Sequence, residues 1–232
     1  MSVLITGASK GMGKSLAEKF AAGGFDLILC ARNENELIGL SEALQNKFKI
    51  KSTIFVADLS KKTSCQEFGN WVHDNNLIVD ILINNCGQFI PGSIFDEPDN
   101  ILEQMMAVNV FSAYHLTRSL IKNMISRRSG HIFNICSIAS LKAYANGGSY
   151  SISKYAMAGF SKNLREEMKA FNIKVTTVYP GAVFTNSWEG TGVEKERIME
   201  VTDISNMIFA ASQLSNQACV EEIIVRPQLG DL

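Results

Sequence analysis

Short apolar runs alternate along the chain with longer segments in which apolar residues recur at helical spacing. The first such segment carries a stripe of Leu16, Ala17, Phe20 and Ala21 and stops at Gly23-Gly24, a pair that favours the end of a helix. The runs between these segments are of strand length, and several are rich in Val and Ile. We therefore expect strands at Val3–Ile5, Leu27–Cys30, Thr53–Val56, Ile81–Ile83, His131–Ile135, Val175–Val178 and Ile223–Val225.

Strand followed by helix, repeated this often, predicts an α/β fold with a parallel sheet covered by helices on both faces. No linker, low-complexity tract or internal repeat divides the chain, so we expect one doubly wound Rossmann domain over residues 1–232. The least regular stretch, 184–202, lies between the last two expected strands and carries Gly190 and Gly192. We expect it to be a mobile loop over a site.

Composition narrows the classes of function. The formal net charge is -1 and 46% of the residues are hydrophobic, which gives no support for nucleic acid as a partner. No apolar run approaches the roughly 20 residues of a membrane span, and the N-terminus lacks the basic flank of a signal peptide. We therefore expect a cytoplasmic protein without a membrane partner.

The cysteines and histidines indicate neither disulfides nor a metal site. The five cysteines form no CxxC pair, so reduced thiols are expected. His73, His115 and His131 lie far apart, without Cys or carboxylate partners at ligand spacing, and are expected at helix surfaces or strand edges. No catalytic metal is predicted.

A glycine-rich loop, Thr6–Gly13, joins the first expected strand to the first helix. Glycine lets the backbone turn tightly and approach a pyrophosphate, and the start of the helix offers free N–H groups and the positive end of its dipole. The spacing is Gly-x3-Gly-x-Gly rather than the commoner GxGxxG, and a plain strand-to-helix turn is the alternative interpretation. The loop residues expected to hold a dinucleotide are Gly7, Ser9, Lys10, Gly11, Met12 and Gly13.

The end of the second strand indicates which dinucleotide binds. Proteins that bind NAD(H) in this way place an acidic residue about 20 residues past the glycines, where it holds the ribose 2′-hydroxyl. Ala31 and Arg32 stand there instead, and Lys10 lies within the glycine loop. Two cations favour a 2′-phosphate, so NADP(H) is predicted over NAD(H), unless both are only solvated surface charges.

Three further groups of residues carry candidate chemistry. Asn84-Asn85-Cys86-Gly87 follows the fourth expected strand, and Ser137 follows the fifth. Tyr150 and Lys154 lie four residues apart in the segment 149–171, which is predicted to be helical. Residues at this spacing share one face of a helix, so both side chains should point toward whatever Ser137 faces.

Together with Pro180-Gly181, these residues resemble the short-chain dehydrogenase/reductase family over nearly the whole chain. The stretches 180–188 and 220–231 are similar to bacterial sepiapterin-reductase-type members, and 3-oxoacyl-carrier-protein reductases come next. The resemblance implies a parallel sheet of seven strands in the order 3-2-1-4-5-6-7. Cys86 departs from the family, which usually has alanine there, and this exchange of one small side chain for another should be tolerated.

The resemblance implies that the chain moves a hydride between nicotinamide and the carbonyl or alcohol carbon of a small molecule. Tyr150 would be the acid that protonates the developing alkoxide. Lys154 would stabilise the tyrosinate and hold the nicotinamide ribose hydroxyls, and Ser137 would hydrogen-bond the substrate oxygen. Asn109 matches the family's fourth catalytic position, which holds a water for proton relay.

The same resemblance extends the cofactor site beyond the glycine loop. Asp58 would contact the adenine amino group, Asn85 would line the adenosine through its backbone, and Thr185 would orient the nicotinamide carboxamide. For Asp58 and Thr185 a role as a cap or turn residue stays open. The further cofactor residues implied are Arg32, Asp58, Leu59, Asn85, Cys86, Gly87, Tyr150, Lys154, Pro180, Gly181, Val183 and Thr185.

The substrate would be a small carbonyl compound or alcohol held near Ser137 and Tyr150. Phe89, Tyr144 and Trp188 are candidate walls for a flat ring such as a pterin, although packing alone also explains them. An aliphatic ketone and an acyl thioester on a carrier protein stay open as alternatives.

Two other classes of function compete with this interpretation. A nucleotide-binding sensor without catalysis is expected to have lost Tyr or Lys from the catalytic pair, and both are present here. An isomerase or dehydratase would need additional length for a sugar-nucleotide domain. Many members of the family pair long helices between subunits, and the segments near 101–127 and 149–171 suit this, so a homodimer or homotetramer is expected.

Overall fold

The computed structural model describes residues 1–185 and 192–231. Across these residues the chain forms one sheet of seven parallel strands in the order β3-β2-β1-β4-β5-β6-β7, which confirms the predicted fold and strand order. Each strand overlaps one of the expected apolar runs. The strands are β1 (Ser2–Thr6), β2 (Asp26–Ala31), β3 (Ser52–Val56), β4 (Ile81–Asn84), β5 (Gly130–Ile135), β6 (Ile173–Pro180) and β7 (Glu222–Val225).

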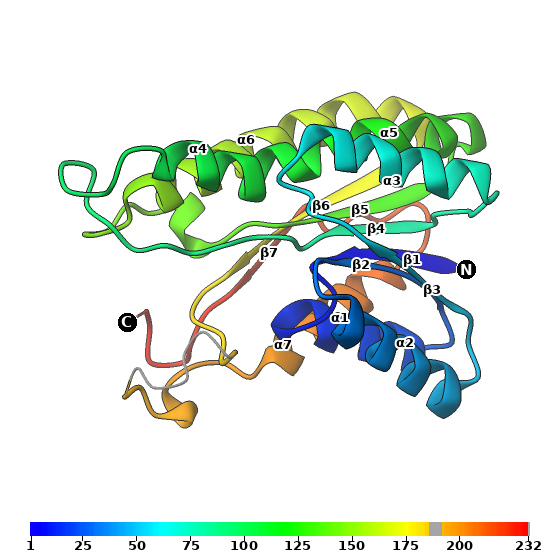
Figure 1. The fold of residues 1–232 in the computed structure, drawn as a ribbon, viewed down its shortest axis with the longest axis horizontal. Coiled ribbons are helices and arrows are strands. Elements are labelled where there is room, and N and C mark those ends of the chain that lie inside the picture. The colour runs from blue at the N-terminus through cyan, green and yellow to red at the C-terminus, as the bar shows by residue number, and fades with distance from the viewer. Residues whose placement is uncertain (186–191, 232) are drawn as a thin grey trace.

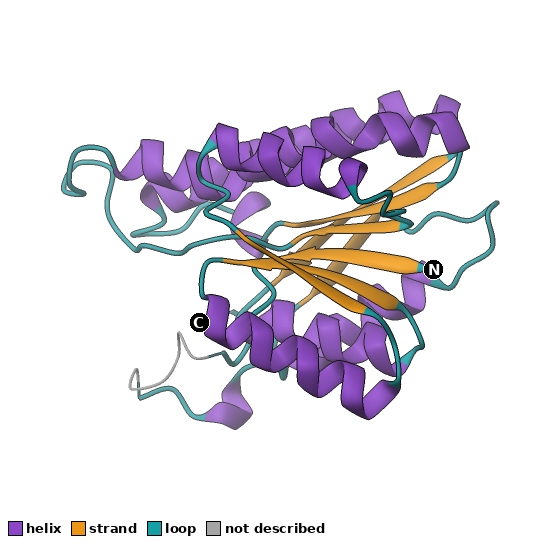
Figure 2. Cartoon of the chain, turned by 45° about the vertical axis from the view of Figure 1, so that its right-hand side comes forward, coloured by secondary structure: helices purple, strands orange, loops and turns teal. Residues whose placement is uncertain are grey.

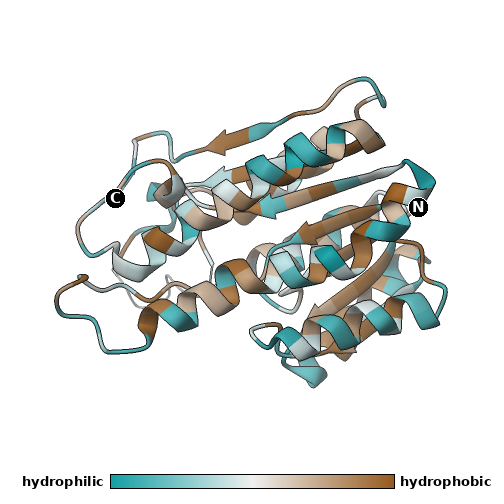
Figure 3. Cartoon of the chain, turned by 90° about the horizontal axis from the view of Figure 1, so that it is seen from above, coloured by the Kyte–Doolittle hydropathy of each residue, from teal (hydrophilic) through white to brown (hydrophobic). Residues whose placement is uncertain are grey.

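Helices cover both faces of the sheet, which runs between them as a twisted middle layer (Figures 1 and 2). One face carries α1 (Gly11–Ala22), α2 (Glu34–Phe48) and α7 (Val201–Ser212). The other carries α3 (Lys62–Asp74), α4 (Ile101–Met106), α5 (Ser112–Arg127) and α6 (Gly148–Met168). Seen from above, the helices of this second face mix brown and teal along their length, as helices with one buried side do (Figure 3).

The two faces of the sheet bury separate apolar clusters, and this explains the continuous apolar runs in the sequence. In β1, Val3 and Ile5 belong to the cluster under α1, α2 and α7, whereas Leu4 belongs to the cluster under α3, α5 and α6. Successive side chains of a strand point to opposite faces, so a strand buried on both faces has no polar side.

The expected helix boundaries agree with the structure at two places and differ at a third. Helix α1 ends at Ala22, and Gly24 adopts φ +78°, the conformation that favours glycine. Helix α6 and a short 3-10 turn, Lys169–Phe171, fill the predicted segment 149–171. The segment 101–127 is not one regular helix, because a π-helical turn, Ala107–Phe111, separates α4 from α5.

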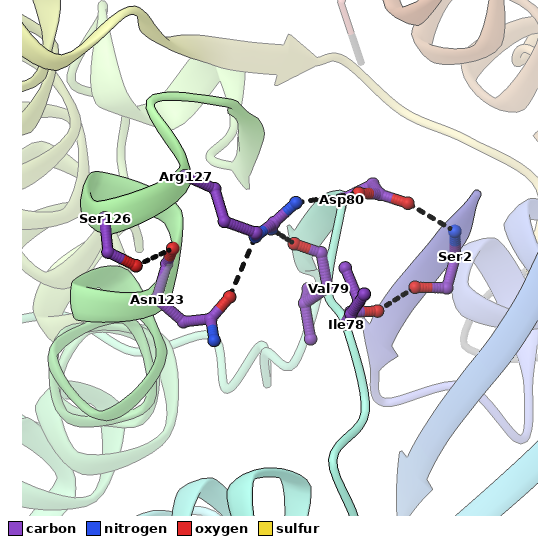
Figure 4. Close-up of polar contacts among 7 residues, drawn as sticks. All are labelled: Ser2, Ile78, Val79, Asp80, Asn123, Ser126 and Arg127. Carbon is purple, nitrogen blue, oxygen red and sulfur yellow. Dashed lines mark hydrogen bonds and ion pairs between the residues drawn. The ribbon is translucent and has the colours of Figure 1, made fainter.

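A polar network ties three segments together at the end of the sheet where the strands begin (Figure 4). Arg127, the last residue of α5, lies 3.1 Å from Asp80 and donates hydrogen bonds to the Val79 carbonyl at 2.7 Å and to Asn123 at 2.9 Å. Asp80 also accepts from the backbone N–H of Ser2 at 2.9 Å. The side chains of Arg127 and Asp80 are 27% and 24% exposed, so water screens this pair less than a surface ion pair.

His131 is not at a strand edge, as the sequence analysis expects, but inside the sheet. It lies in β5, which pairs with β4 on one side and β6 on the other, and its Nε2 is 2.7 Å from the Thr176 hydroxyl. That hydroxyl donates its proton to the Val220 carbonyl at 2.6 Å, so it accepts from His131 and fixes the proton on Nε2. Burial, with a smaller effect of Lys174, lowers the pKa of His131 to about 3. His73 and His115 lie on helices, as expected.

Candidate active site

A groove of about 940 Å³ opens at the carboxyl ends of the central strands. Strand β1 has β2 on one side and β4 on the other, so the direction of the sheet connections reverses here. Ligands of doubly wound sheets bind at such a switch point. The expected cofactor residues that line the groove are Gly7, Ser9, Lys10, Gly11, Met12, Arg32, Asp58, Leu59, Asn85, Cys86, Gly87 and Thr185.

The glycine loop requires glycine for two separate reasons. Gly7 and Gly11 have φ angles of +62° and +50°, which side chains disfavour. Gly13 does not line the groove; it lets α1 pack against the loop, because a Cβ there would lie 2.1 Å from the Gly7 carbonyl oxygen. The first turn of α1 has no acidic residue and no side-chain cap, so its N–H groups are available to an anion. A pyrophosphate fits this cradle.

Asn85 holds the glycine loop against the end of β4. Its side-chain amide donates to the carbonyl oxygens of Thr6 and Gly7 at 2.9 and 3.2 Å. The Thr6 hydroxyl oxygen accepts from the backbone N–H groups of Asn85 and Cys86, both at 3.0 Å. These reciprocal bonds between side chain and backbone hold together the ends of β1 and β4, which border the groove.

Charged side chains gather at the end of the groove next to β2. Arg32 lines it, whereas Lys10 is paired with Glu36 at 2.8 Å. Asp58 accepts from the backbone N–H and the hydroxyl of Ser60, at 3.1 and 2.8 Å. Asp58 therefore has the role of a turn residue that the sequence left open, and it also lines the groove. Burial alone would raise the pKa of Asp58, but the Ser60 hydrogen bonds and the charge of Arg32 outweigh it and hold that pKa below its usual range.

Glu36 is one of several groove residues that the sequence analysis did not predict, and it is the one paired with Lys10. A carboxylate that binds the ribose is expected at the end of β2, but Glu36 reaches the groove from the first turn of α2. An acidic residue in the first turn of the helix after β2 is the only sequence signal for it, and such residues are common because they favour the helix dipole. Cys30, Ala31, Asn33, Glu34, Ala57, Gln88 and Val108 also line the groove without having been expected to.

Helix α6 places Tyr150 and Lys154 on one face, as their spacing predicts. The Lys154 side chain is buried, and its Nζ lies 5.8 Å from the centre of the Tyr150 ring and donates to the Ile135 carbonyl at 3.1 Å. Among the described residues Ile135 is its only hydrogen-bond partner, so further N–H donors are left for a ligand. A Cβ on Gly87 would lie 3.5 Å from Nζ, which puts the ammonium group next to the wall of the groove.

Ser137 follows β5 and begins a 3-10 turn that packs against α6. Its Oγ accepts from the backbone N–H of Ala139 at 3.1 Å, and within the described part of the chain its own O–H makes no hydrogen bond. The hydroxyl proton is therefore available to a ligand. The structure thus gives Ser137 the donor that a substrate oxygen would need.

Two of the three expected substrate residues can be placed. Phe89 packs edge-on against Tyr150, with 4.8 Å between the ring centres, and is 52% exposed. Tyr144 is 46% exposed, and burial together with the nearby Tyr150 raises the pKa of its hydroxyl. Trp188 lies outside the described residues.

Asn109 is buried in the π-helical turn and uses its whole side chain. Its Oδ1 accepts from the backbone N–H of Gln88 at 2.7 Å, and its Nδ2 donates to the Gln88 carbonyl at 3.0 Å and to Ser153 at 2.9 Å. The π turn was not foreseen, because an extra residue in one turn leaves no periodic signal; such turns recur at functional sites. Asn109 thus holds the loop segment that follows Gly87 against α6.

The segment after β6 crosses the glycine loop. Pro180 ends β6, and the Gly181 N–H donates to the Val225 carbonyl at 2.8 Å. Neither residue lines the groove. The Val183 side chain is buried, and Val183 lies opposite Met199 in a parallel bridge. The hydrogen bonds of this bridge come from the neighbours of Val183, so they do not use its own N–H and C=O. The Thr185 methyl lies 3.3 Å from the position of a Cβ on Gly11. Residues 186–191 of the expected loop lie outside the described residues.

No helix in the described ranges is long and apolar enough to cross a membrane. The same residues contain no group of three or more His, Cys, Asp or Glu side chains placed to hold a metal ion. All five cysteines are free thiols. Burial raises the pKa of Cys65 to about 12 and that of Cys136 to about 11, so these thiols stay protonated at neutral pH.

Comparison with known proteins shows to which family this arrangement of groove and side chains belongs. A family model described as short chain dehydrogenase matches residues 1–195. The chain belongs to the short-chain dehydrogenase family. The predicted resemblance is therefore confirmed, and it covers the groove, Tyr150 and Lys154 alike.

Relatives span nearly the whole chain. A sepiapterin reductase of Chlorobaculum tepidum is 31% identical over 238 residues, covering 99% of this chain and 97% of its own length. The structure is similar to a metagenomic short-chain oxidoreductase in complex with NADP, with a TM-score of 0.84 and 26% identity over 98% of this chain and 97% of that one. It is also similar to L-sorbose reductase from Gluconobacter frateurii complexed with NADPH and L-sorbose, with a TM-score of 0.89 and 25% identity over 97% and 94% of the two chains.

Proposed function

We propose that this member of the family is an NADP(H)-dependent oxidoreductase, a single dinucleotide-binding catalytic domain over residues 1–232, that reduces the carbonyl of a small molecule to an alcohol. The observation that carries the proposal is that the groove wall lies next to Lys154, whose ammonium group is 5.8 Å from the centre of the Tyr150 ring. Gly87 lines the groove, and the position of its absent Cβ is 3.5 Å from Lys154 Nζ. When bound, NADPH supplies the hydride for the carbonyl carbon.

Three side chains of the chain act on the substrate oxygen and its proton. Tyr150 gives its hydroxyl proton to the oxygen as negative charge develops there. Ser137 donates its O–H to the same oxygen, because its Oγ is already oriented by Ala139. Lys154 stabilises the tyrosinate that results, and its buried position strengthens this effect because little water screens the charge.

Asn109 takes part in the proton relay through its backbone. Its side-chain amide is committed to Gln88 and Ser153, so it has no free group for a water molecule. We assign the water that returns a proton to Tyr150 through Lys154 to the Asn109 backbone carbonyl in the π-helical turn. The side chain instead positions Gly87 and Gln88 beside the nicotinamide.

The cofactor is NADP(H) rather than NAD(H). Ala31 ends β2 where NAD-binding sheets place an acidic residue, and Arg32 and Lys10 lie at the same end of the groove. The 2′-phosphate carries nearly two negative charges, which these cations attract. The complexes of the metagenomic relative with NADP and of L-sorbose reductase with NADPH support this choice. The Val183 backbone and Thr185 hold the nicotinamide end.

The substrate is a ring-bearing carbonyl compound of the pterin type. Phe89 lies edge-on against Tyr150 and is half exposed, so it offers a flat apolar wall beside the proton donor. The relative named sepiapterin reductase, which this chain matches over nearly its full length, supports the same class. A general ketone or a 3-oxoacyl thioester on a carrier protein is the alternative.

A panel of carbonyl compounds tests both parts of the proposal. Purified protein is mixed with NADPH and sepiapterin, a diketone or an acetoacetyl thioester, and the loss of NADPH absorbance is followed. Sepiapterin is expected to give the highest kcat/KM. Fast turnover of the thioester alone would favour the carrier-protein alternative. Binding of NADPH without turnover of any carbonyl would contradict catalysis and favour a nucleotide sensor.

The protein acts in the cytoplasm as a homodimer or homotetramer. Its five free thiols suit a reducing compartment. Exposed apolar side chains gather on α5, α6 and the π turn, where a second subunit would cover Phe111, Tyr114, Ile152 and Tyr155. Light scattering after gel filtration is expected to give at least twice the mass of one chain, and a monomer would contradict this.

A further inference from the structure

The charges at the β2 end of the groove do not all favour a phosphate. Lys10 and Arg32 line this end, but so do the carboxylates of Glu34, Glu36 and Asp58. Glu36 pairs directly with the cation of the glycine loop, since its Oε1 lies 2.8 Å from Lys10 Nζ. An anion that enters the groove therefore meets a lysine that already has a partner.

Helix α2 fixes the place of Glu36. Asn33 caps the helix by accepting from the backbone N–H of Glu36 at 3.2 Å, so Glu36 stands in the first turn next to the end of β2. Its side chain is 31% exposed, yet Oε2 is buried and makes no well-formed hydrogen bond to a described residue, although the Ser9 hydroxyl lies nearby. Buried polar atoms normally have a partner, so Oε2 is a spare acceptor at the wall of the groove.

An ionised Glu36 acts in opposite ways on the two kinds of ribose. The hydrogen bond from Lys10 holds the pKa of Glu36 below its usual range, so the carboxylate is charged at neutral pH. A 2′-phosphate is repelled by this charge and must compete with it for Lys10. A 2′-hydroxyl is a donor, and a carboxylate is the group that usually accepts from it.

Resting on the dinucleotide site proposed above, we propose that Glu36 is a cofactor-specificity-determining residue that opposes Lys10 and Arg32. It weakens the binding of a 2′-phosphorylated ribose and accepts a hydrogen bond from an unphosphorylated one. The chain therefore discriminates less strongly between NADP(H) and NAD(H) than its two cations alone would dictate. The acidic residue missing from the end of β2 is supplied, in part, from the helix that follows.

Two fragments that differ only in the 2′-phosphate test this inference. Adenosine 2′,5′-bisphosphate and AMP are titrated by calorimetry into the full-length protein, so the readout does not depend on turnover. In Glu36→Gln the ratio of the AMP Kd to the bisphosphate Kd is expected to rise about tenfold, mostly through tighter binding of the bisphosphate. Glu42→Gln removes an exposed carboxylate from the same helix outside the groove, and it should leave both constants unchanged.

The ratio separates a role in selection from a role in structure. A variant that only loosens α2 weakens both fragments alike and leaves the ratio unchanged, and this result would overturn the inference. A falling ratio would overturn it too, because Glu36 would then be orienting Lys10 toward the phosphate. If the unaltered protein binds neither fragment, the proposed function fails together with the inference. If it binds the bisphosphate and only the response to Glu36→Gln is missing, the proposed function stands.

Discussion

Lys154 donates a hydrogen bond of 3.1 Å to the backbone carbonyl of Ile135, and this contact joins helix α6 to the end of β5. It holds a buried ammonium group between Tyr150 and the groove. A lysine that served packing alone would not need its charge at this place, since burying a charge opposes folding. The contact therefore predicts that activity and stability respond differently when the charge is removed.

Lys154→Met keeps most of the buried chain and removes the ammonium group. We expect kcat/KM to fall about 10²- to 10⁴-fold, because the tyrosinate loses its stabilising cation. The free energy of unfolding should change by less than about 1 kcal/mol, since the lost hydrogen bond is offset by relief of the buried charge. Steady-state kinetics and urea denaturation measure the two effects. Lys162→Met breaks only an exposed ion pair with Glu222, so it should leave activity unchanged and alter the free energy of unfolding by less than about 1 kcal/mol. Normal turnover by Lys154→Met would count against the role of Lys154 in catalysis.

Gly13→Ala tests the packing of the glycine loop. The added methyl group would meet the Gly7 carbonyl oxygen at 2.1 Å, a backbone atom that cannot move without opening the loop. We expect the free energy of unfolding to fall by about 2–4 kcal/mol, with loss of NADPH binding. In the middle of α2, Gly39→Ala meets nothing within 4 Å and should raise stability by about 0.5–1 kcal/mol. Denaturant titration compares them, and equal effects would show that the close approach is unimportant.

Arg32→Ala should affect the two coenzymes unequally. A guanidinium that binds the 2′-phosphate contributes about 1.5–3 kcal/mol, so kcat/KM with NADPH should fall about 10- to 100-fold. The value with NADH should stay within about twofold, because NADH has no phosphate for the arginine to bind. Lys47→Ala, which removes a cation from the far end of α2, serves as the control. Equal losses with both coenzymes would indicate that Arg32 supports the fold instead.

The buried His131 predicts a loss of stability in mild acid. Its pKa is lowered to about 3 in the folded protein, whereas an unfolded histidine titrates near its ordinary value of about 6.5. Between these values the unfolded state binds a proton that the native state does not, so the free energy of unfolding decreases as the pH is lowered, by at most about 1.4 kcal/mol per pH unit. His131→Gln keeps an N–H donor for Thr176 and should show a shallower pH dependence in urea denaturation. His73→Gln, at an exposed position, should leave the pH dependence of the free energy of unfolding unchanged. The same pH dependence in His131→Gln as in the unaltered protein would contradict the argument.

Much of this fold was predictable because its sheet is buried on both faces. Continuous runs such as Val3–Ile5 identify the strands without any alternation, and the spacing of Tyr150 and Lys154 places both on one side of a helix. The glycine loop could also be predicted, because its position before a helix limits what it can do. These features depend on local periodicity and on neighbours in the chain.

The features that sequence reasoning missed depend on contacts between distant segments. Glu36 belongs to the groove only because α2 starts beside Lys10, and His131 is buried only because β5 has a strand on each side. The π turn holds Asn109, whose side chain bonds Gln88 and Ser153, and no spacing in the sequence reveals these contacts. Boundaries and burial of this kind are set by tertiary packing rather than by local pattern.

Replacement of Tyr150 by Phe tests the central claim most directly, since it removes one oxygen and keeps the ring that packs against Phe89. NADPH binding should stay within about twofold, while kcat/KM for the best carbonyl substrate should fall about 10²- to 10⁴-fold. Tyr155→Phe makes the same change on the outer surface of the helix, which the proposed second subunit would cover; it keeps the ring there and should retain full activity. Normal turnover by Tyr150→Phe, with NADPH bound as tightly as before, would contradict the account.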